Sequence, residues 1–324
     1  MKKVIIRVLL IVLFLSLGYI IWDNYRIVLV EETIILENFP DQLDYLRILQ
    51  ISDLHEKEFG RNQKRLINKI NSTEYDVIVF TGDLLNDTES ENYDSFYKLI
   101  EGIDNKEHAL YVRGNTDPLN YQIDQSVDKS NFIKGMEERG VKLLESIYSI
   151  PVNNNHVHFV YFDLSIISDS TYIGRLEGVE RPEYVDDKHY LTYQKKLWQE
   201  ISLAEIIRED DLLIAVNHYP IADNRVNHIK NNPGLVWHDF DLIIAGHYHG
   251  GQIRIPFKGA LFVPEPWYEP NQLFPPQNRV KGLWKYAGVN QYVSAGLGNS
   301  GAVPLLNFRL FNPPEINLLT LSKK

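Results

Sequence analysis

The sequence predicts a mixed α/β protein that follows one N-terminal membrane-spanning helix. Three observations support this: an apolar stretch with basic flanks opens the chain, short apolar runs then alternate with amphipathic segments, and several of those runs end in Asp, Asn or His. With 324 residues, of which 44% are hydrophobic, the chain is long enough for one large domain or two small ones.

The first element is the apolar stretch. Lys2, Lys3 and Arg7 precede a run that ends at Trp22 and approaches the length of about 20 residues that spans a bilayer. No small-residue cleavage site follows it, so an uncleaved anchor is expected rather than a removed signal peptide. A buried core helix is the alternative interpretation.

This assignment divides the chain into an anchor over residues 1–22 and a single domain over residues 23–324. Basic residues precede the apolar run, whereas Asp23 and Glu31 follow it. The positive-inside rule then puts the N-terminus in the cytoplasm and the domain outside it, on a single-pass cell-membrane protein.

The first half of the domain shows repeated strand–loop–helix units. We expect strands at residues 27–36, 45–52, 77–81 and 109–112, and helices around residues 65–70 and 93–100. Polar residues follow directly after three of these strands, where open α/β sheets place their functional sites.

The second half is less regular. We expect helices at residues 131–140 and 190–207, and strands at residues 141–144, 148–152, 156–163, 212–216, 242–245 and 316–321. Residues 166–187 are polar and loop-like, which makes them a candidate cap over a substrate. The aromatic and proline-rich residues 262–276 are either a surface loop or a contact with substrate or bilayer.

The composition restricts the chemistry. Net charge is −10, which argues against nucleic acid as a partner. The chain has no cysteine, so any metal must be held by His, Asp, Glu or Asn.

The stretch from Asp241 to Gly251 is the most suggestive single motif. Its apolar run ends at Gly246 and leads into His247 and His249, which alternate in extended backbone and therefore project to the same side. By itself the motif fits either a pair of metal ligands or a pair of histidines on a solvated turn.

The rest of the chain favours the metal. Buried strands are followed in order by seven candidate ligands: Asp53 and His55, Asp83, Asn115, His218, and His247 and His249. Seven oxygen and nitrogen donors are too many for one closed tetrahedral zinc, and they suit two divalent ions such as Mn, Fe or Zn. Two such ions can hold a bridging hydroxide and clamp phosphoryl oxygens.

These motifs resemble, in order, those of the calcineurin-like metallophosphoesterase superfamily. The segments His249-Gly250-Gly251-Gln252, Gly296-Leu297-Gly298 and Pro313-Pro314-Glu315-Ile316 are similar to its bacterial membrane-associated branch. The resemblance implies a four-layer α/β/β/α sandwich with two facing mixed sheets.

The resemblance also implies how the ligands divide. Asp53, His55, Asp83 and His249 would hold one ion, and Asp83, Asn115, His218 and His247 would hold the other. Asp83 and Asn115 would then be catalytic, and Asn115 and Thr116 would contact the substrate.

One position departs from the family pattern. Thr116 stands where the family has a histidine that helps to protonate the leaving group, and threonine is no acid near neutral pH. Losing a general acid costs about 10² to 10⁴ in rate when the leaving group needs a proton, and little when it is a stable anion. Asn86 is a smaller departure, since the family often has Asp there; the adjacent Asp87 is a candidate substitute.

The sequence therefore predicts a membrane-anchored phosphoesterase that cleaves a phosphodiester or a pyrophosphate, with a lipid-linked or envelope-derived substrate as one option. UDP-diacylglucosamine hydrolysis, known in related enzymes, would need a cytoplasmic domain, against the charge pattern. The alternative is a metal-binding homologue whose catalysis is weak or lost because of Thr116. His189 and His228 are candidate replacement acids, whereas His156 and His158 alternate along a strand and are expected to be structural.

Overall fold

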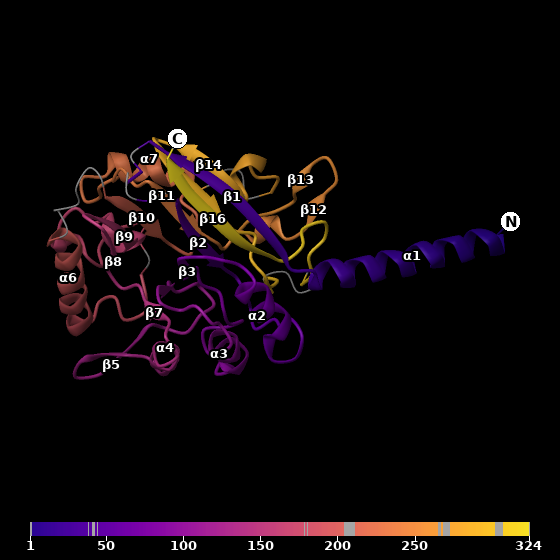
Figure 1. Ribbon diagram of the computed structural model, residues 1–324, viewed down its shortest axis with the longest axis horizontal. Coiled ribbons are helices and arrows are strands. Elements are labelled where there is room, and N and C mark those ends of the chain that lie inside the picture. The colour runs from indigo at the N-terminus through magenta and orange to yellow at the C-terminus, as the bar shows by residue number, and fades with distance from the viewer. Residues whose placement is uncertain are drawn as a thin grey trace.

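The computed structural model describes residues 2–37, 39–40, 43, 45–177, 179, 181–203, 211–264, 267, 273–301 and 307–323. A single helix, α1 (Lys2–Tyr25), projects from a body built around two sheets (Figure 1). Among the described residues it is the one helix long and apolar enough to cross a membrane, and only Asp23 and Asn24, at its end, are buried. It continues three residues past the end expected at Trp22.

The first sheet contains both ends of the domain. Its order is β1 (Val28–Leu36), β16 (Glu315–Lys323), β2 (Tyr45–Ile51), β3 (Val77–Phe80), β4 (Ala109–Tyr111) and β7 (Lys142–Leu143). Strand β16 is parallel to β1 and antiparallel to β2, and the remaining pairs are parallel. The last strand of the chain therefore joins the first strand after the helix to the rest of the sheet.

The second sheet has a parallel centre and an antiparallel hairpin at each edge. Its order is β14 (Gly282–Tyr286), β15 (Val289–Val293), β11 (Leu242–Ala245), β10 (Leu212–Val216), β9 (Asn155–Tyr161) and β8 (Ile147–Val152). Strands β15, β11, β10 and β9 run parallel, whereas β14 and β8 run antiparallel to their neighbours.

The two sheets face each other across the main core. Side chains such as Ile48 and Val79 from the first sheet pack with Phe159 and Ile244 from the second. Successive residues of a strand point to opposite faces, so Leu49 next to Ile48 packs outward, against the helices.

Helices complete the outer layers. The first sheet is covered by α2 (Lys64–Asn71), α3 (Asp94–Glu101) and α4 (Asn131–Glu137), and the second by α7 (Asp223–Asn231), with α6 (Lys188–Leu203) beside it. The molecule is thus the four-layer α/β/β/α sandwich with two mixed sheets that was expected.

The structure also differs from the sequence expectations in places. Helix α7 was not anticipated, because its polar sequence carries apolar residues only at Val226 and Ile229, which pack on the second sheet. Two small hairpins were also not anticipated: β5 (Tyr121–Ile123) with β6 (Val127–Lys129), and β12 (Arg254–Ile255) with β13 (Gly259–Ala260). Residues 204–207 of the expected helix, and residues 265, 266 and 268–272 of the proline-rich segment, lie outside the described part.

Candidate metal centre

The predicted ligands meet because the two sheets present the carboxyl ends of their parallel strands to the same place. Asp53, Asp83 and Asn115 follow β2, β3 and β4 of the first sheet, and His218 and His247 follow β10 and β11 of the second. The sheets are joined directly here, since the backbone N–H of His247 donates to both carboxylate oxygens of Asp53 at 3.1 and 3.2 Å.

One group of predicted ligands comprises Asp53, His55, Asp83 and His249, all buried, whose ligand atoms lie within 4.8 Å of one another. The Nε2 atoms of His55 and His249 are 3.2 Å apart. His55 Nε2 lies 3.6 Å from Asp83 Oδ2, and His249 Nε2 lies 3.6 Å from Asp53 Oδ1. These separations suit four atoms arranged around one ion.

A second group shares Asp83. The ligand atoms of Asp83, His218 and His247 also lie within 4.8 Å of one another. His218 Nε2 is 3.3 Å from Asp83 Oδ2, 3.1 Å from His247 Nδ1 and 3.1 Å from Asn115 Oδ1. Asp83 therefore stands between two ligand sets, as a bridging carboxylate would.

Exposure marks the open side of this centre. Asn115 is exposed and Thr116 is half-buried, whereas the other six predicted ligands are buried. A substrate would approach from the side of Asn115.

The backbone at the site is held in an unusual conformation. Five of the predicted ligands have a positive φ, which residues other than glycine rarely adopt: Asp53 (52°), His55 (48°), Asp83 (53°), His247 (68°) and His249 (49°). Such conformations persist where the surrounding structure enforces them, and they cluster at functional sites.

Glycines allow the loops to pass each other closely. A Cβ on Gly82 would overlap the backbone of Gly114, and a Cβ on Gly246 would overlap the hydroxyl of Ser52. Gly82 also has a φ of +81°. The glycines that precede Asp83, Asn115 and His247 are therefore required for the ligand loops to converge.

Hydrogen bonds orient the imidazoles. Nδ1 of His218 lies 2.7 Å from the carbonyl oxygen of Thr81, and Nε2 of His247 lies 2.9 Å from that of Pro264. When these nitrogens carry the proton, the other nitrogen of each ring presents its lone pair to the cluster, the usual arrangement around metal-ligating histidines.

Burial and mutual charge interactions shift the pKa values of these groups. Burial raises the pKa of Asp53 to about 6, and it also opposes ionisation of Asp83, but His218, His55 and His247 hold the pKa of Asp83 well below its usual range. The pKa of His218 rises to about 9 because Asp83 outweighs its burial, and burial with the charge of His218 lowers the pKa of His247 to about 3. A buried set that mixes carboxylates with imidazoles fits two divalent cations, which would compensate the burial of the carboxylate charges.

The structure gives Thr116 a supporting position. Its hydroxyl donates to the carbonyl oxygen of Leu85 at 2.7 Å, and its backbone N–H donates to Asp83 Oδ1 at 2.8 Å. The side chain therefore holds the loop that carries Asp83 rather than pointing a donor at a substrate.

Asp117, the next residue, was not singled out from the sequence. Its buried carboxylate accepts hydrogen bonds from the backbone N–H groups of Leu84 and Gly114 and from the hydroxyl of Tyr111. It thus ties the loop after β3 to the loop after β4.

Asp87 was the candidate substitute for the aspartate that the family often has at position 86. In the structure its carboxylate accepts a hydrogen bond from the backbone N–H of Glu89 at 2.9 Å.

Arg309 was also missed, although a single arginine in the apolar run from Phe308 to Phe311 is a detectable signal. Its fully buried guanidinium donates to the carbonyl oxygens of Gly298 (2.7 Å) and Ala295 (2.6 Å), and Nη2 lies 3.5 Å from Nδ1 of His249. Burial lowers its pKa to about 10.

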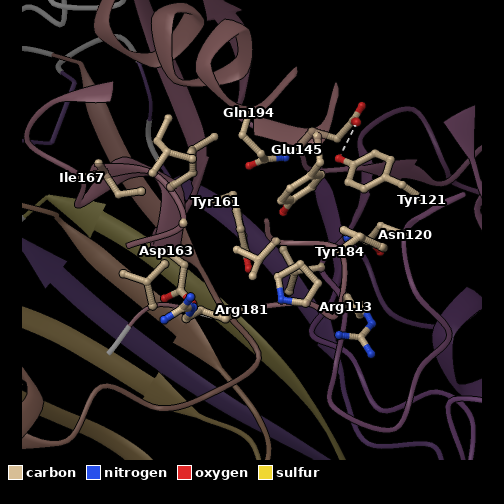
Figure 2. Close-up of a pocket in the computed structure, with 18 of the residues that line it drawn as sticks. Arg113, Asn120, Tyr121, Glu145, Tyr161, Asp163, Ile167, Arg181, Tyr184 and Gln194 are labelled. Atoms are coloured by element: carbon tan, nitrogen blue, oxygen red, sulfur yellow. Dashed lines mark hydrogen bonds between the residues drawn. The ribbon is translucent and has the colours of Figure 1, made fainter. Parts of the chain in front are cut away.

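A pocket begins two residues from Asn115, at Arg113. Its empty volume is about 830 Å³, including space open to solvent. Arg113 and Arg181 lie along one side of it in the view of Figure 2. Residues 166–187, the candidate cap, supply much of the wall, including the apolar side chains Ile167, Ile173 and Leu176.

The two candidate replacement acids lie on outer helices. His189 is in the first turn of α6, and His228 is near the end of α7, where its ring lies 5.4 Å from that of Trp267. Within the described part of the chain, neither side chain contacts a predicted ligand.

The family model for calcineurin-like phosphoesterases matches residues 46–251, which run from β2 to two residues past the second histidine of the Gly-His-x-His motif. The chain belongs to the calcineurin-like phosphoesterase family. It is accordingly a metallophosphoesterase, and the family binds divalent metals at clustered residues of the kind described above.

Individual relatives in this family are distant but nearly full-length. The uncharacterized metallophosphoesterase YkuE of Bacillus subtilis is 23% identical over 307 residues, covering 92% of this chain and 87% of its own. The UDP-2,3-diacylglucosamine pyrophosphatase LpxG of Chlamydia muridarum is 23% identical over 301 residues, covering 85% of this chain and 83% of its own.

Proposed function

We propose that this metallophosphoesterase is anchored by α1 and hydrolyses a pyrophosphate or phosphodiester of a lipid-linked or envelope-derived substrate. The observation that carries the proposal is the contact between the end of α1 and residues 309–312, which lie next to His249. The similarity to LpxG, whose name describes a pyrophosphatase acting on a diacylated sugar nucleotide, supports the same substrate class.

The anchor joins the domain directly, without a flexible linker. Only Arg26 and Ile27 separate α1 from β1. The ring of Tyr19, within α1, lies 5.7 Å from that of Phe311, which is exposed beside the helix. Tyr19 is only about 9 Å along the helix from Tyr25, where α1 ends. If α1 spans a bilayer, Phe311 beside Tyr19 therefore lies at the membrane surface.

The metal centre is close to this surface. Asn312, next to Phe311, donates from Nδ2 to the carbonyl oxygen of His249 at 2.7 Å. A predicted ligand is therefore one contact away from the segment that touches the anchor, which supports a phosphate presented at headgroup depth.

We assign the ligands as the two clusters suggest. Asp53, His55, Asp83 and His249 would hold one ion, and Asp83, Asn115, His218 and His247 the other. Two bound divalent ions supply Lewis-acid stabilisation of phosphoryl oxygens and lower the pKa of water. Asp83, which belongs to both ligand sets, would fix the distance between the two ions. Asn115, which is exposed, would contact the phosphate on the open side.

Thr116 indicates which class of leaving group the site can release. Because its hydroxyl hydrogen is committed to Leu85, the site has no acid at this position. A phosphate monoester leaves as a stable anion and needs no such acid, which favours pyrophosphate over an alkyl diester.

The pocket suits the remainder of an amphipathic substrate. Arg113 and Arg181 offer cations to a second phosphate or another anionic group, and the apolar wall of the cap can cover a hydrophobic group. The acidic net charge supports the expectation that nucleic acid is not a partner.

The test uses the full-length protein in detergent, with Mn²⁺ and three substrate classes: a phosphomonoester, an aryl phosphodiester and a lipid pyrophosphate. Cleavage of the lipid pyrophosphate in preference to the others supports the proposal. Metal binding without turnover on any substrate would support instead a homologue that has lost catalysis. A C-terminal reporter active only in the cytoplasm would overturn the extracytoplasmic orientation.

A further inference from the structure

A second cluster of metal-ligating side chains lies at the other end of the second sheet. His156 and His158 are on β9, and Asp211 directly precedes β10. Strands β9 and β10 are parallel, with His158 opposite Leu213. The cluster is at their amino ends, whereas His218 follows the carboxyl end of β10, seven residues after Asp211 and roughly 23 Å away in extended chain.

The geometry of the cluster suits one ion. One potential ligand atom from each of the three residues lies within 4.8 Å of the others. His158 Nε2 is 3.5 Å from Asp211 Oδ2, and His156 Nδ1 is 3.9 Å from Asp211 Oδ1. Ligand atoms around tetrahedral zinc, each about 2.0–2.1 Å from the ion, are roughly 3.4 Å apart, so small movements would close the set.

The surrounding contacts orient the side chains for this role. Nδ1 of His158 lies 2.8 Å from the hydroxyl of Ser149, on the neighbouring strand β8. With the proton on Nδ1, the lone pair of Nε2 points toward Asp211. In the described part of the structure this buried Nε2 has no hydrogen-bond partner.

The carboxylate is equally well placed. Asp211 Oδ1 accepts the backbone N–H of His156 at 2.7 Å, which fixes the carboxylate across the two strands. The side chain of Asp211 is 2% exposed and that of His158 is 10% exposed, but that of His156 is 43% exposed. An ion could therefore enter from solvent past His156.

A simple ion pair explains the cluster less well. Burial lowers the pKa of His158 even though Asp211 favours its charged form. Burial thus opposes the charged form of the imidazole, and the uncharged ring is the form that binds metals.

We propose that His156, His158 and Asp211 form a third metal site, separate from the catalytic centre, that takes Zn²⁺ or a similar borderline divalent ion. Two imidazoles and one carboxylate are typical zinc ligands, and solvent would complete the coordination. The ion would link the β8–β9 hairpin to the start of β10. Its role is structural, because the cluster lies at the amino ends of β9 and β10, the opposite end of the strands from the one that His218 follows.

The experiment separates this site from the catalytic one. Full-length protein carrying Asp83→Asn, which disables the shared ligand, is titrated with Zn²⁺ by calorimetry and with Co²⁺ by absorption spectroscopy. To this background we add His158→Ala or Asp211→Asn. Asp211→Asn keeps an oxygen for the N–H of His156, so it preserves the fold if His158→Ala does not. His108→Ala is the matched control, since His108 also lies beside a carboxylate, that of Glu107, but has no second imidazole.

The expected result is one Zn²⁺ site that survives Asp83→Asn and His108→Ala and is lost with His158→Ala and Asp211→Asn. Ser149→Ala should weaken it by roughly 10- to 100-fold, as loss of an orienting partner does. Zinc should also raise the unfolding temperature of the Asp83→Asn protein but not of the double variants. Equal zinc binding in all variants would overturn the proposal, whether or not the protein hydrolyses lipid pyrophosphates.

Discussion

Asn24, at the end of α1, and Arg309, behind the predicted ligand His249, are joined by two hydrogen bonds across 285 residues of sequence. Asn24 Nδ2 donates to the carbonyl oxygen of Arg309 at 2.8 Å, and the backbone N–H of Arg309 donates to Asn24 Oδ1 at 2.8 Å. Helix α1 and the cluster of predicted ligands are thus connected through one buried arginine.

Asn24→Ala should weaken this connection. Two buried backbone groups of Arg309 would lose their partner, at a cost of about 1–3 kcal/mol each in unfolding free energy. Thermal unfolding in detergent should show a lower midpoint, and a chelator should remove metal faster because Arg309 contacts His249. Asn231→Ala is the control, since Asn231 makes one exposed bond within α7. Equal midpoints for the two variants would contradict the coupling.

Asp83→Asn should disable both ligand groups at once, because Asp83 belongs to each. We expect the catalytic centre to lose its metal, measured by elemental analysis against wild-type protein. Activity should fall by more than the roughly 10- to 100-fold typical for loss of an outer partner. Asp87→Asn, on the exposed part of the same loop, should retain both metal and activity; matched losses would argue against a special role for Asp83.

Thr116→His tests the leaving-group argument. If the absent acid limits the rate, an aryl or alkyl diester should be hydrolysed faster, by up to about 10² to 10⁴. Hydrolysis of a pyrophosphate should change little, because its leaving group is already a stable anion. Thr116→Ser, which keeps the hydroxyl that binds Leu85, is the control. The same gain on both substrates would show that the effect is not protonation.

Asp241 gives a prediction for pH. Its carboxylate, at the start of β11, accepts the backbone N–H of Leu213 at 2.8 Å, and burial raises its pKa from 3.8 to about 6. A raised pKa means that the folded protein favours the protonated form, so its contribution to stability is complete below pH 3.8 and is lost as pH rises through 6.

Asp241→Asn should therefore stabilise the protein at pH 7.5 by at most about 3 kcal/mol, since the pKa rises from 3.8 to about 6 and one pKa unit corresponds to about 1.4 kcal/mol. The amide oxygen can still accept from Leu213. Denaturant unfolding at pH 7.5 and pH 4 measures the difference, which should be much smaller at the lower pH. Exposed Asp239→Asn is the control, and a gain independent of pH would contradict the assignment.

The sequence was sufficient for the main elements of the fold because their physical signals are local. Buried strands such as β3 and β10 are apolar throughout, and each ends where a polar residue follows a short run. Helix α7 lacked such a signal, having two apolar anchors in nine residues. The pairing of β16 between β1 and β2 is a long-range register that no local pattern encodes.

The sequence by itself determined which residues are candidate ligands, their order and the absence of a histidine at position 116, since these depend on residue type and on position after a strand. Only the tertiary structure decided which atoms meet. It brought Asp83 into both ligand groups, committed the hydroxyl of Thr116 to Leu85, and put Arg309 between α1 and His249. It also gathered His156 and His158, which were expected to be structural, around Asp211. The reason is that ligation and proton transfer depend on separations of a few ångströms, and those arise only when the two sheets pack face to face.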